Sequence, residues 1–200
     1  MTEKITISKG NRKMGEIKSV SLPPVVTCAE GCTCAKKCYA MKMCRIYKNV
    51  KASYDKNLSI YETNPNEYWQ QVEDAMCTSR FFRMHVAGDI PTYKYLLEMI
   101  FVVAHNPWCD ILVFTKRYDF VNRWLDEGGE LPSNLHLIFS EWEGMEMNNP
   151  HNLPVAHVIF KGEEPKENWN ICSGNCLECA KKKANCWSLG NGEHVAFHEH

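Results

Sequence analysis

Two groups of cysteines dominate the chemistry that this sequence could perform. The N-terminal cysteine set lies in the stretch TCAEGCTCAKKCYA and consists of Cys28, Cys32, Cys34 and Cys38. The C-terminal cysteine set lies near the other end and consists of Cys172, Cys176, Cys179 and Cys186. Eleven cysteines in 200 residues, an odd count with no secretion signal, argue against a disulfide framework. Clustered thiols in a reducing compartment indicate metal ligands instead.

The spacing of the N-terminal cysteine set favours iron-sulfur over zinc. Structural zinc sites usually contain a C-x2-C knuckle, and this set has three, one and three intervening residues. An iron-sulfur cube accepts irregular spacings. Because Cys32 and Cys34 are separated by only one residue, we expect three of the four thiols to bind one [4Fe-4S] cluster. Such a cube keeps one iron open to a substrate or cofactor.

The C-terminal cysteine set does include one knuckle, Cys176 to Cys179. Three interpretations of this set stay open. It could bind a second iron-sulfur cluster, it could bind zinc, or it could donate a fourth ligand to the first cluster. The last arrangement would close the open iron and would favour a structural or redox role.

The elements that must position these cysteines indicate an α/β chain. SVSLPPVVTC is expected to be extended because its prolines disfavour helix, and apolar positions at helical spacing predict one long helix over residues 38–58. Asn64, Pro65 and Glu67 predict the start of a helix that runs to Cys77. Further strands are expected in RFFRMHVAG, ILVFTK, LHLIFSEW and VAHVIF, with helices over residues 91–105 and 119–126.

This alternation predicts a largely parallel sheet, either an incomplete TIM-like barrel or an open doubly wound sheet. We favour the incomplete barrel, carried with the N-terminal cysteine set by residues 1–165. Residues 166–200 are expected to form a cysteine-rich extension packed on the same domain. His194, His198 and His200 have a metal-like composition, but we expect them to form a flexible end.

Polar residues follow the predicted strands where ligands collect in parallel α/β sheets, at the carboxyl ends. They are Gly88, Asp89, Thr115, Lys116 and Ser140. Gly88, Asp89, Thr115 and Ser140 are candidates for cofactor binding. Asp89 is also a candidate base or a cap of the following helix, and Lys116 a candidate catalytic or anion-binding residue.

Two further candidates lie on the strand that precedes Gly88. Strict alternation would place Arg83 and His85 on one face, away from Phe82 and Met84. Two ionisable groups pointing into the interior need partners or a ligand. We interpret His85 as an acid/base group or an iron ligand and Arg83 as an anion clamp. A satisfied buried pair is the alternative.

The N-terminal cysteine set carries a resemblance to a known family. Cys28, Cys34 and Cys38, followed by Tyr-Ala, form C-x5-C-x3-C-Y-A and leave Cys32 as an extra thiol. This pattern resembles that of cysteine-rich bacteriophage proteins distantly related to the radical S-adenosylmethionine superfamily. The resemblance continues through FRMHVAGD, VFTKR, LPSNLHLIFS and the final Cys-Trp pair.

The resemblance implies a radical-SAM-like fold, a [4Fe-4S] cluster and an S-adenosylmethionine site. It places Gly88-Asp89 where the superfamily turn receives the methionine amino group. The usual C-x3-C-x2-C spacing occurs here only in the C-terminal cysteine set, in the position of the superfamily's auxiliary clusters. The departure leaves the binding of S-adenosylmethionine as an open alternative.

Net charge and hydropathy bear on the partners of the protein and on its location in the cell. A formal net charge of −1 argues against a large footprint on nucleic acid, although lysines crowd the segment after Cys38 and leave a local basic patch open. The N-terminus lacks the apolar core of a signal peptide, and no apolar run is long enough to span a membrane. We therefore expect a cytoplasmic protein, in the host cytoplasm if it is phage-encoded.

Three functions follow from these patterns. The first is an iron-sulfur enzyme that uses an open iron and S-adenosylmethionine. The second keeps the cluster but uses the iron as a Lewis acid in hydrolysis or hydration of an ester-type substrate. The third is a zinc- or cluster-stabilised module that binds a host protein. The expected partners are a small-molecule substrate or cofactor and, in the third case, a host protein, with nucleic acid left open.

Overall fold

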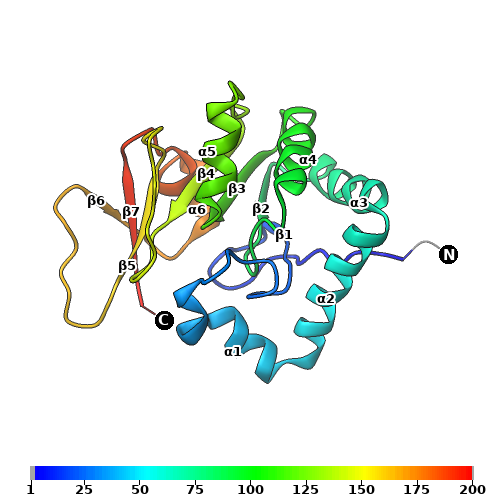
Figure 1. The fold of residues 1–200 in the computed structure, drawn as a ribbon, viewed down its shortest axis with the longest axis horizontal. Helices are drawn as coiled ribbons and strands as arrows, with labels where there is room; N and C mark the ends of the chain where they lie inside the picture. Colours follow the sequence, from blue (N-terminus) through cyan, green and yellow to red (C-terminus); the bar gives the residue numbers. More distant parts are fainter. Residues whose placement is uncertain (1–2, 200) are drawn as a thin grey trace.

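The chain folds around one sheet of seven strands, and the computed structural model describes residues 3–199. All neighbouring strands of this sheet run parallel, in the order β1-β2-β3-β4-β5-β7-β6 (Figure 1). The strands are β1 (Lys18–Val20), β2 (Phe81–Met84), β3 (Asp110–Thr115), β4 (Leu135–Ser140), β5 (Val155–Ile159), β6 (Trp169–Ile171) and β7 (His194–His198). The helices are η1 (Thr33–Lys37), α1 (Tyr39–Ile46), α2 (Lys48–Thr63), α3 (Pro65–Cys77), α4 (Tyr93–Ala104), α5 (Tyr118–Asp126), α6 (Cys176–Lys182) and η2 (Asn185–Trp187).

The parallel α/β architecture expected from the sequence is confirmed. The sheet is not closed, because β1 and β6 each have one neighbour and lie at its two edges. A barrel is therefore not seen in the described residues. The two edge strands are the ones that lead into the cysteine sets, since the N-terminal set follows β1 and Cys172 follows β6 directly.

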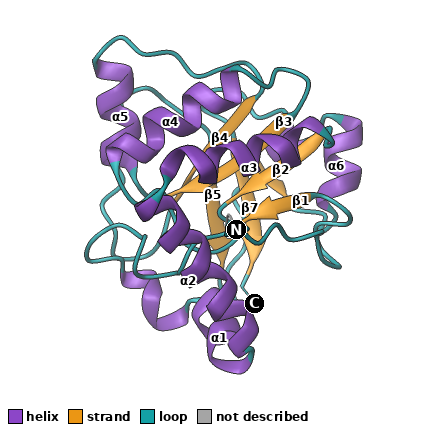
Figure 2. Ribbon diagram, turned by 90° about the vertical axis from the view of Figure 1, so that its right-hand side faces the viewer, coloured by secondary structure: helices purple, strands orange, loops and turns teal. Residues whose placement is uncertain are grey.

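One face of the sheet packs against four helices. Phe82, Ile111 and Leu135 are paired in register across β2, β3 and β4 and belong to the larger apolar core. Residues of α2, α3, α4 and α5 complete this core, and Figure 2 shows α3 and α4 lying across the sheet. Burial of the apolar side chains on this face is the main favourable contribution to folding.

The opposite face carries a smaller core. Leu112 and Ile138, which alternate with the helix-facing residues, pack with Met14, with Ala180 of α6 and with Trp187 of η2. The N-terminal segment is joined to the start of α6, because the backbone N–H of Cys176 donates to the carbonyl of Lys13 at 3.0 Å. The C-terminal cysteine set therefore lies over the sheet face that the large helices leave free.

The predicted helices hold with two corrections. The helix α3 and its cap are confirmed, since the Asn64 side chain accepts from the Glu67 backbone N–H. The long helix predicted over residues 38–58 is wrong, because Tyr47 is extended and separates α1 from α2. The predicted cap of α4 is also wrong, because its first turn is capped by Thr92 and not by Asp89.

The C-terminal residues form strands that sequence patterns did not predict. His194 and His198 begin and end β7, a paired strand and not a flexible end, while His200 lies outside the described residues. Glu199 directly follows β7 and forms an ion pair with Lys37 of η1, with Oε1 and Nζ 3.3 Å apart. In Figures 1 and 2 the chain that leaves β7 runs toward α1. Among residues 3–199, no helix is long and apolar enough to cross a membrane.

Candidate functional site

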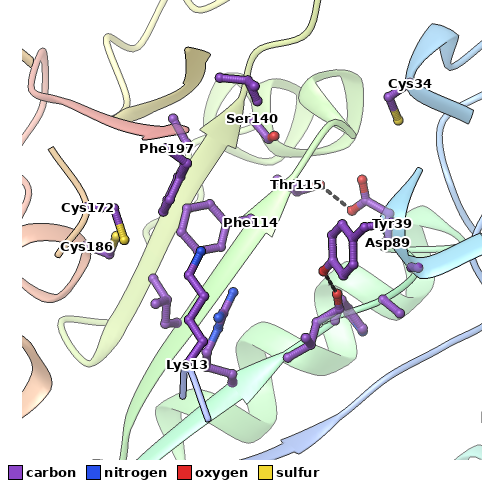
Figure 3. A pocket seen from close by; sticks show the side chains of 18 of the residues that line it. Lys13, Cys34, Tyr39, Asp89, Phe114, Thr115, Ser140, Cys172, Cys186 and Phe197 are labelled. Atoms are coloured by element: carbon purple, nitrogen blue, oxygen red, sulfur yellow. Dashed lines mark hydrogen bonds between the residues drawn. The ribbon is translucent and has the colours of Figure 1, made fainter. Parts of the chain in front are cut away.

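Both cysteine sets line one cavity of about 690 Å³, which also contains Arg83, Lys116 and Ser140. Its volume is typical of small-molecule sites, which range from about 300 to 1,000 Å³. Figure 3 shows Phe114 and Phe197 in the middle of the cavity wall, between Cys172 and Cys186 on one side and Cys34 on the other. Residues more than 130 positions apart in the chain thus meet around one space.

The N-terminal cysteine set lies on the loop that follows β1 and on η1. The Sγ atoms of Cys32 and Cys34 are 2.8 Å apart, so these two thiols face each other. The backbone N–H of Val25 donates to Cys28 Sγ at 3.3 Å.

Val25 adopts a left-handed conformation, with φ of 72°. This conformation is unusual for a β-branched residue and stores strain on the order of 1–3 kcal/mol. The strained residue is the one whose N–H reaches the Cys28 sulfur. Strain of this kind is concentrated at sites with a function, and here it orients a donor toward a thiol.

The thiols of this set differ in acidity. Burial raises the pKa of Cys28 to about 11. The hydrogen bond between Cys32 and Cys34 lowers the pKa of Cys32 and raises that of Cys34, and the Lys116 ammonium lowers both. Without a bound metal, the Cys32–Cys34 pair therefore loses its first proton readily and its second only with difficulty.

The sulfurs of the C-terminal cysteine set also receive polar contacts. The backbone N–H of Gly174 donates to Cys172 Sγ at 3.4 Å, and the Asn185 amide donates to Cys179 Sγ at 3.3 Å. Arg83 Nη1 lies 3.9 Å from Cys176 Sγ. Cys186 is buried and lies within electrostatic range of the three other thiols of the set. These donors suit sulfurs that carry negative charge.

The side chains as placed do not converge on a single point. Within residues 3–199, no three His, Cys, Asp or Glu side chains form a group that could hold a metal ion. What the two cysteine sets share is the cavity that lies between them.

Arg83 and His85 do not share the environment expected from strand alternation. Arg83 faces the smaller core, with its guanidinium 5.2 Å from the Phe114 ring centroid. His85 has φ of 58°, so the strand ends at Met84 and the alternation stops there. The imidazole turns toward α4, where Nε2 lies 2.9 Å from the Tyr95 hydroxyl.

His85 is held in a buried hydrogen-bonded chain. The Tyr95 hydroxyl also lies 2.8 Å from the Tyr68 hydroxyl, and His85 is only 4% exposed. Burial lowers the pKa of His85 to about 3, so the imidazole is neutral at physiological pH. Its Nδ1 has no partner among the described residues. The structure therefore favours a neutral hydrogen-bonding group over a general acid.

Asp89 joins the ends of two strands. Its Oδ1 accepts from the Ile90 backbone N–H at 2.8 Å and from the Thr115 hydroxyl at 2.6 Å, and its Oδ2 accepts from the Lys116 backbone N–H at 2.8 Å. Burial raises its pKa, and these three bonds oppose the rise. Asp89 and Thr115 thus position the strand ends, and their polar atoms are largely engaged within the protein.

Gly88 allows the chain to make this turn. It has φ of +76°, and a Cβ at this position would lie 2.6 Å from both the Leu22 carbonyl oxygen and the Thr27 hydroxyl. The Thr27 hydroxyl in turn accepts the Asp89 backbone N–H at 3.1 Å. The glycine is needed for close packing of the loop after β1 on the turn after β2. This packing holds Thr27, which directly precedes Cys28.

Lys116 and Ser140 both line the cavity, and their side chains are hydrogen-bonded to each other. Lys116 Nζ donates to Ser140 Oγ at 2.9 Å and lies 5.8 Å from the Trp142 ring centroid. Because the ammonium donates, the Ser140 hydroxyl keeps its own proton for another acceptor. The pair places a cation and a hydroxyl beside the N-terminal cysteine set.

Comparison with known proteins places the chain in a family. The family model described as gene product 88 matches residues 2–195. The chain belongs to the gene product 88 family. That description fits a bacteriophage protein, in agreement with part of the resemblance noted from the sequence. The searches of curated proteins and of solved structures gave no match.

One polar cluster of this gene product 88 protein was not predicted from the sequence. His157 Nδ1 is hydrogen-bonded to the Glu141 carboxylate, and its Nε2 lies 2.9 Å from His194 Nδ1. The His157 ring stacks on Trp169, with centroids 3.9 Å apart. The signal that could have found His157 was a histidine within the apolar run VAHVIF, but pairing with His194 depends on the position of β7, which no local pattern predicts.

Proposed function

We propose that this gene product 88 protein is an iron-sulfur enzyme. In this proposal Cys28, Cys34 and Cys38 hold a [4Fe-4S] cluster and leave one iron open to the cavity. The observation that supports it best is that both cysteine sets line a cavity of small-molecule size. The position of the sets after the two edge strands supports the finer proposal that the fold is a radical-SAM-like incomplete barrel.

The donor set suits such a cluster in its chemistry. Half-buried thiols with an N–H···S contact from strained Val25 are the ligand type and the outer contact that iron-sulfur sites use. Cys32 lies beside Cys34 and is an alternate ligand. The fit rests on this chemistry and not on a metal geometry already formed by the side chains.

The reaction we propose is hydrolysis or hydration of an ester-type substrate. The open iron, when bound, would supply a Lewis acid for a substrate oxygen. Lys116 and Ser140 would orient the substrate through the ammonium and the hydroxyl proton. Of the two bases considered from the sequence, Asp89 has both oxygens engaged and His85 Nε2 is bonded to Tyr95, so positioning is the role that suits them.

Radical chemistry with S-adenosylmethionine is the second candidate. It is supported by the position of the N-terminal cysteine set, which follows the first strand of a parallel sheet. The engaged carboxylate of Asp89 counts against it, because the resemblance assigns this turn to the methionine amino group. For this reason we place the Lewis-acid reaction first.

The remaining assignments follow from this proposal. The C-terminal cysteine set holds a second iron-sulfur cluster, holds zinc or closes the first cluster, and metal analysis separates these three. We propose action in the host cytoplasm on a small molecule. A metal-stabilised module that binds a host protein, or nucleic acid through its basic segment, is the non-enzymatic alternative.

Anaerobic purification followed by quantification of iron, sulfide and zinc tests the proposal. We expect about four irons and four sulfides for the first cluster. The Cys34→Ala variant should lose them together with hydrolysis of simple aryl esters, and the matched control Cys77→Ala, an exposed cysteine on α3, should lose neither.

Electron paramagnetic resonance separates the two enzymatic candidates. A reduced-cluster signal that does not change when S-adenosylmethionine is added supports the Lewis-acid reaction, whereas a shifted signal supports the radical one. A colourless protein with two zinc ions would overturn both.

A further inference from the structure

Acidic side chains that line the cavity have partners within the protein, whereas two of the basic side chains there form no ion pair among the described residues. Two carboxylates line it, and each is engaged: Glu199 pairs with Lys37, and Asp89 accepts three hydrogen bonds from the ends of β2 and β3. Arg83 and Lys116 also line the cavity, and neither forms an ion pair with a carboxylate in residues 3–199. Arg83 and Lys116 are therefore cations of the cavity wall that no carboxylate of these residues neutralises.

Arg83 is the less satisfied of these two cations. Its Nε is buried and has no hydrogen-bond partner among the described residues. Within residues 3–199, its guanidinium makes one side-chain hydrogen bond, the 3.9 Å contact from Nη1 to Cys176 Sγ. A guanidinium always carries a positive charge and only donates hydrogen bonds. An anionic ligand in the cavity that Arg83 lines would match this charge.

The wall around Arg83 is apolar. The guanidinium lies over Phe114, and the Phe114 and Phe197 rings meet edge to face with centroids 5.7 Å apart. Leu112 and Ala156 line the same space. Figure 3 shows both phenylalanine rings at the centre of the wall, with Ser140 beyond them. A ligand that fills this space needs an apolar body as well as an anionic group.

We propose that the cavity binds a small organic carboxylate. The carboxylate pairs with the Arg83 guanidinium, which lines the cavity and as a planar fork can donate two N–H groups to a planar acid. The apolar body lies against Phe114 and Phe197, and the Ser140 hydroxyl, oriented by Lys116, donates to a second oxygen of the ligand. This inference rests on the proposed function only in calling the ligand a substrate.

Binding of three probes to the full chain, purified anaerobically, tests the carboxylate. The probes are 3-phenylpropionate, its uncharged amide and inorganic phosphate, titrated by calorimetry at low ionic strength. We expect the carboxylate to bind at least tenfold more tightly than either of the other two. Equal binding of the amide would show an apolar cavity without an anion site, and equal or tighter binding of phosphate would show a general anion site. Either result overturns the proposal.

Variants identify the residue that carries the binding. Arg83→Gln should weaken 3-phenylpropionate at least tenfold, and Arg83→Lys, which keeps the charge but not the fork, should weaken it less. The matched control is Lys37→Gln, a cavity-lining cation already paired with Glu199, and it should change affinity less than twofold. Unchanged affinity in Arg83→Gln would overturn the proposal.

A measurement on the unaltered chain covers the case in which the Arg83 variants fail to fold. The ¹⁵N–¹H signal of Arg83 Nε should shift when 3-phenylpropionate is added and stay in place with the amide. An unmoved signal at saturation would contradict the contact. The carboxylate site and the proposed function fail separately, because binding that persists in protein without iron leaves the site intact while removing the iron-sulfur enzyme.

Discussion

The Asp89 carboxylate accepts a 2.6 Å hydrogen bond from the Thr115 hydroxyl, and this contact joins the ends of β2 and β3 beneath the N-terminal cysteine set. Both residues are buried, at 5% and 1% exposure. The same carboxylate accepts the Lys116 backbone N–H, so it also fixes the residue that donates to Ser140. A side chain expected to contact a ligand instead holds Lys116 in place within the protein.

Asp89→Asn should destabilise the protein by about 1–3 kcal/mol, because an amide NH₂ cannot accept the bonds that both carboxylate oxygens accept and would leave a buried donor unsatisfied. Urea denaturation measures the change. The control Asp119→Asn removes a largely exposed carboxylate paired with Arg117 and should cost less than about 1 kcal/mol. Equal effects of the two substitutions would contradict this account of Asp89.

Gly88→Ala should cost more than Gly128→Ala. Both glycines have positive φ, +76° and +82°, but a Cβ at Gly88 would contact backbone and hydroxyl oxygens at 2.6 Å, while a Cβ at Gly128 has nothing within 4 Å. Gly128→Ala therefore bears only the conformational cost, about 1 kcal/mol, and Gly88→Ala also bears displacement of the β1 loop. Denaturation midpoints and the iron content of the N-terminal set give the comparison.

His85 should make the protein less stable in acid. Its pKa in the folded protein is lowered to about 3 from 6.5, so between these values the unfolded chain binds a proton that the folded chain does not. Its contribution to stability is fully present above pH 6.5 and is lost as the pH falls toward 3, by up to about 1.4 kcal/mol per pH unit.

His85→Asn should flatten this part of the pH profile, since asparagine tolerates the left-handed conformation but does not titrate. Urea denaturation at several pH values between 4 and 7.5 gives the difference between the two proteins. Parallel profiles would show that His85 does not cause the acid sensitivity.

The imidazole of His85 should carry its proton on Nδ1. If Tyr68 donates to Tyr95 and Tyr95 donates to Nε2, only the Nδ1 proton is left without a partner. The reverse order leaves both an unpaired hydroxyl proton and an unpaired nitrogen, which costs more. Histidine ¹⁵N chemical shifts report the tautomer directly. A proton on Nε2 in the wild type would be incompatible with this order, and Tyr95→Phe should let the tautomer populations mix.

Cys32→Ala should retain the iron of the first cluster, whereas Cys34→Ala should lose it. The resemblance implies that Cys34 is a ligand and Cys32 an extra thiol. Substitution of Cys32, whose sulfur lies 2.8 Å from that of Cys34, removes a neighbour without removing the proposed ligand set. Anaerobic iron and sulfide analysis of the two variants decides the assignment. Iron lost from Cys32→Ala and kept by Cys34→Ala would reverse the roles.

Local patterns predicted the parts of this fold that depend on local physics. The cap of α3 follows from the Asn64-Pro65-Glu67 chemistry, and four buried strands follow from short apolar runs. The break at Tyr47 and the left-handed turn at His85 were missed, because nothing in their neighbouring residues excludes a helix or a continuing strand. Only packing against distant elements decides them.

The candidate site was predictable in its residues but not in its arrangement. Cysteine spacing marked both sets, and the strand ends marked Lys116 and Ser140. That the two sets face each other depends on which strands occupy the sheet edges, a property of the whole topology. The contact between His157 and His194 was missed for the same reason, because the two residues become neighbours only through pairing of β5 with β7.

The strand β7 lies between β5 and β6 in the sheet, although it follows both in the chain. During synthesis on a ribosome, β6 thus has no neighbour to pair with until residues 194–198 emerge, and the Cys172 N–H has no Ala196 carbonyl to bind. The N-terminal cysteine set is made long before its opposite wall exists. If the proposed cluster is inserted during synthesis, iron and sulfide therefore reach an open loop, and β7 completes the cavity wall afterwards.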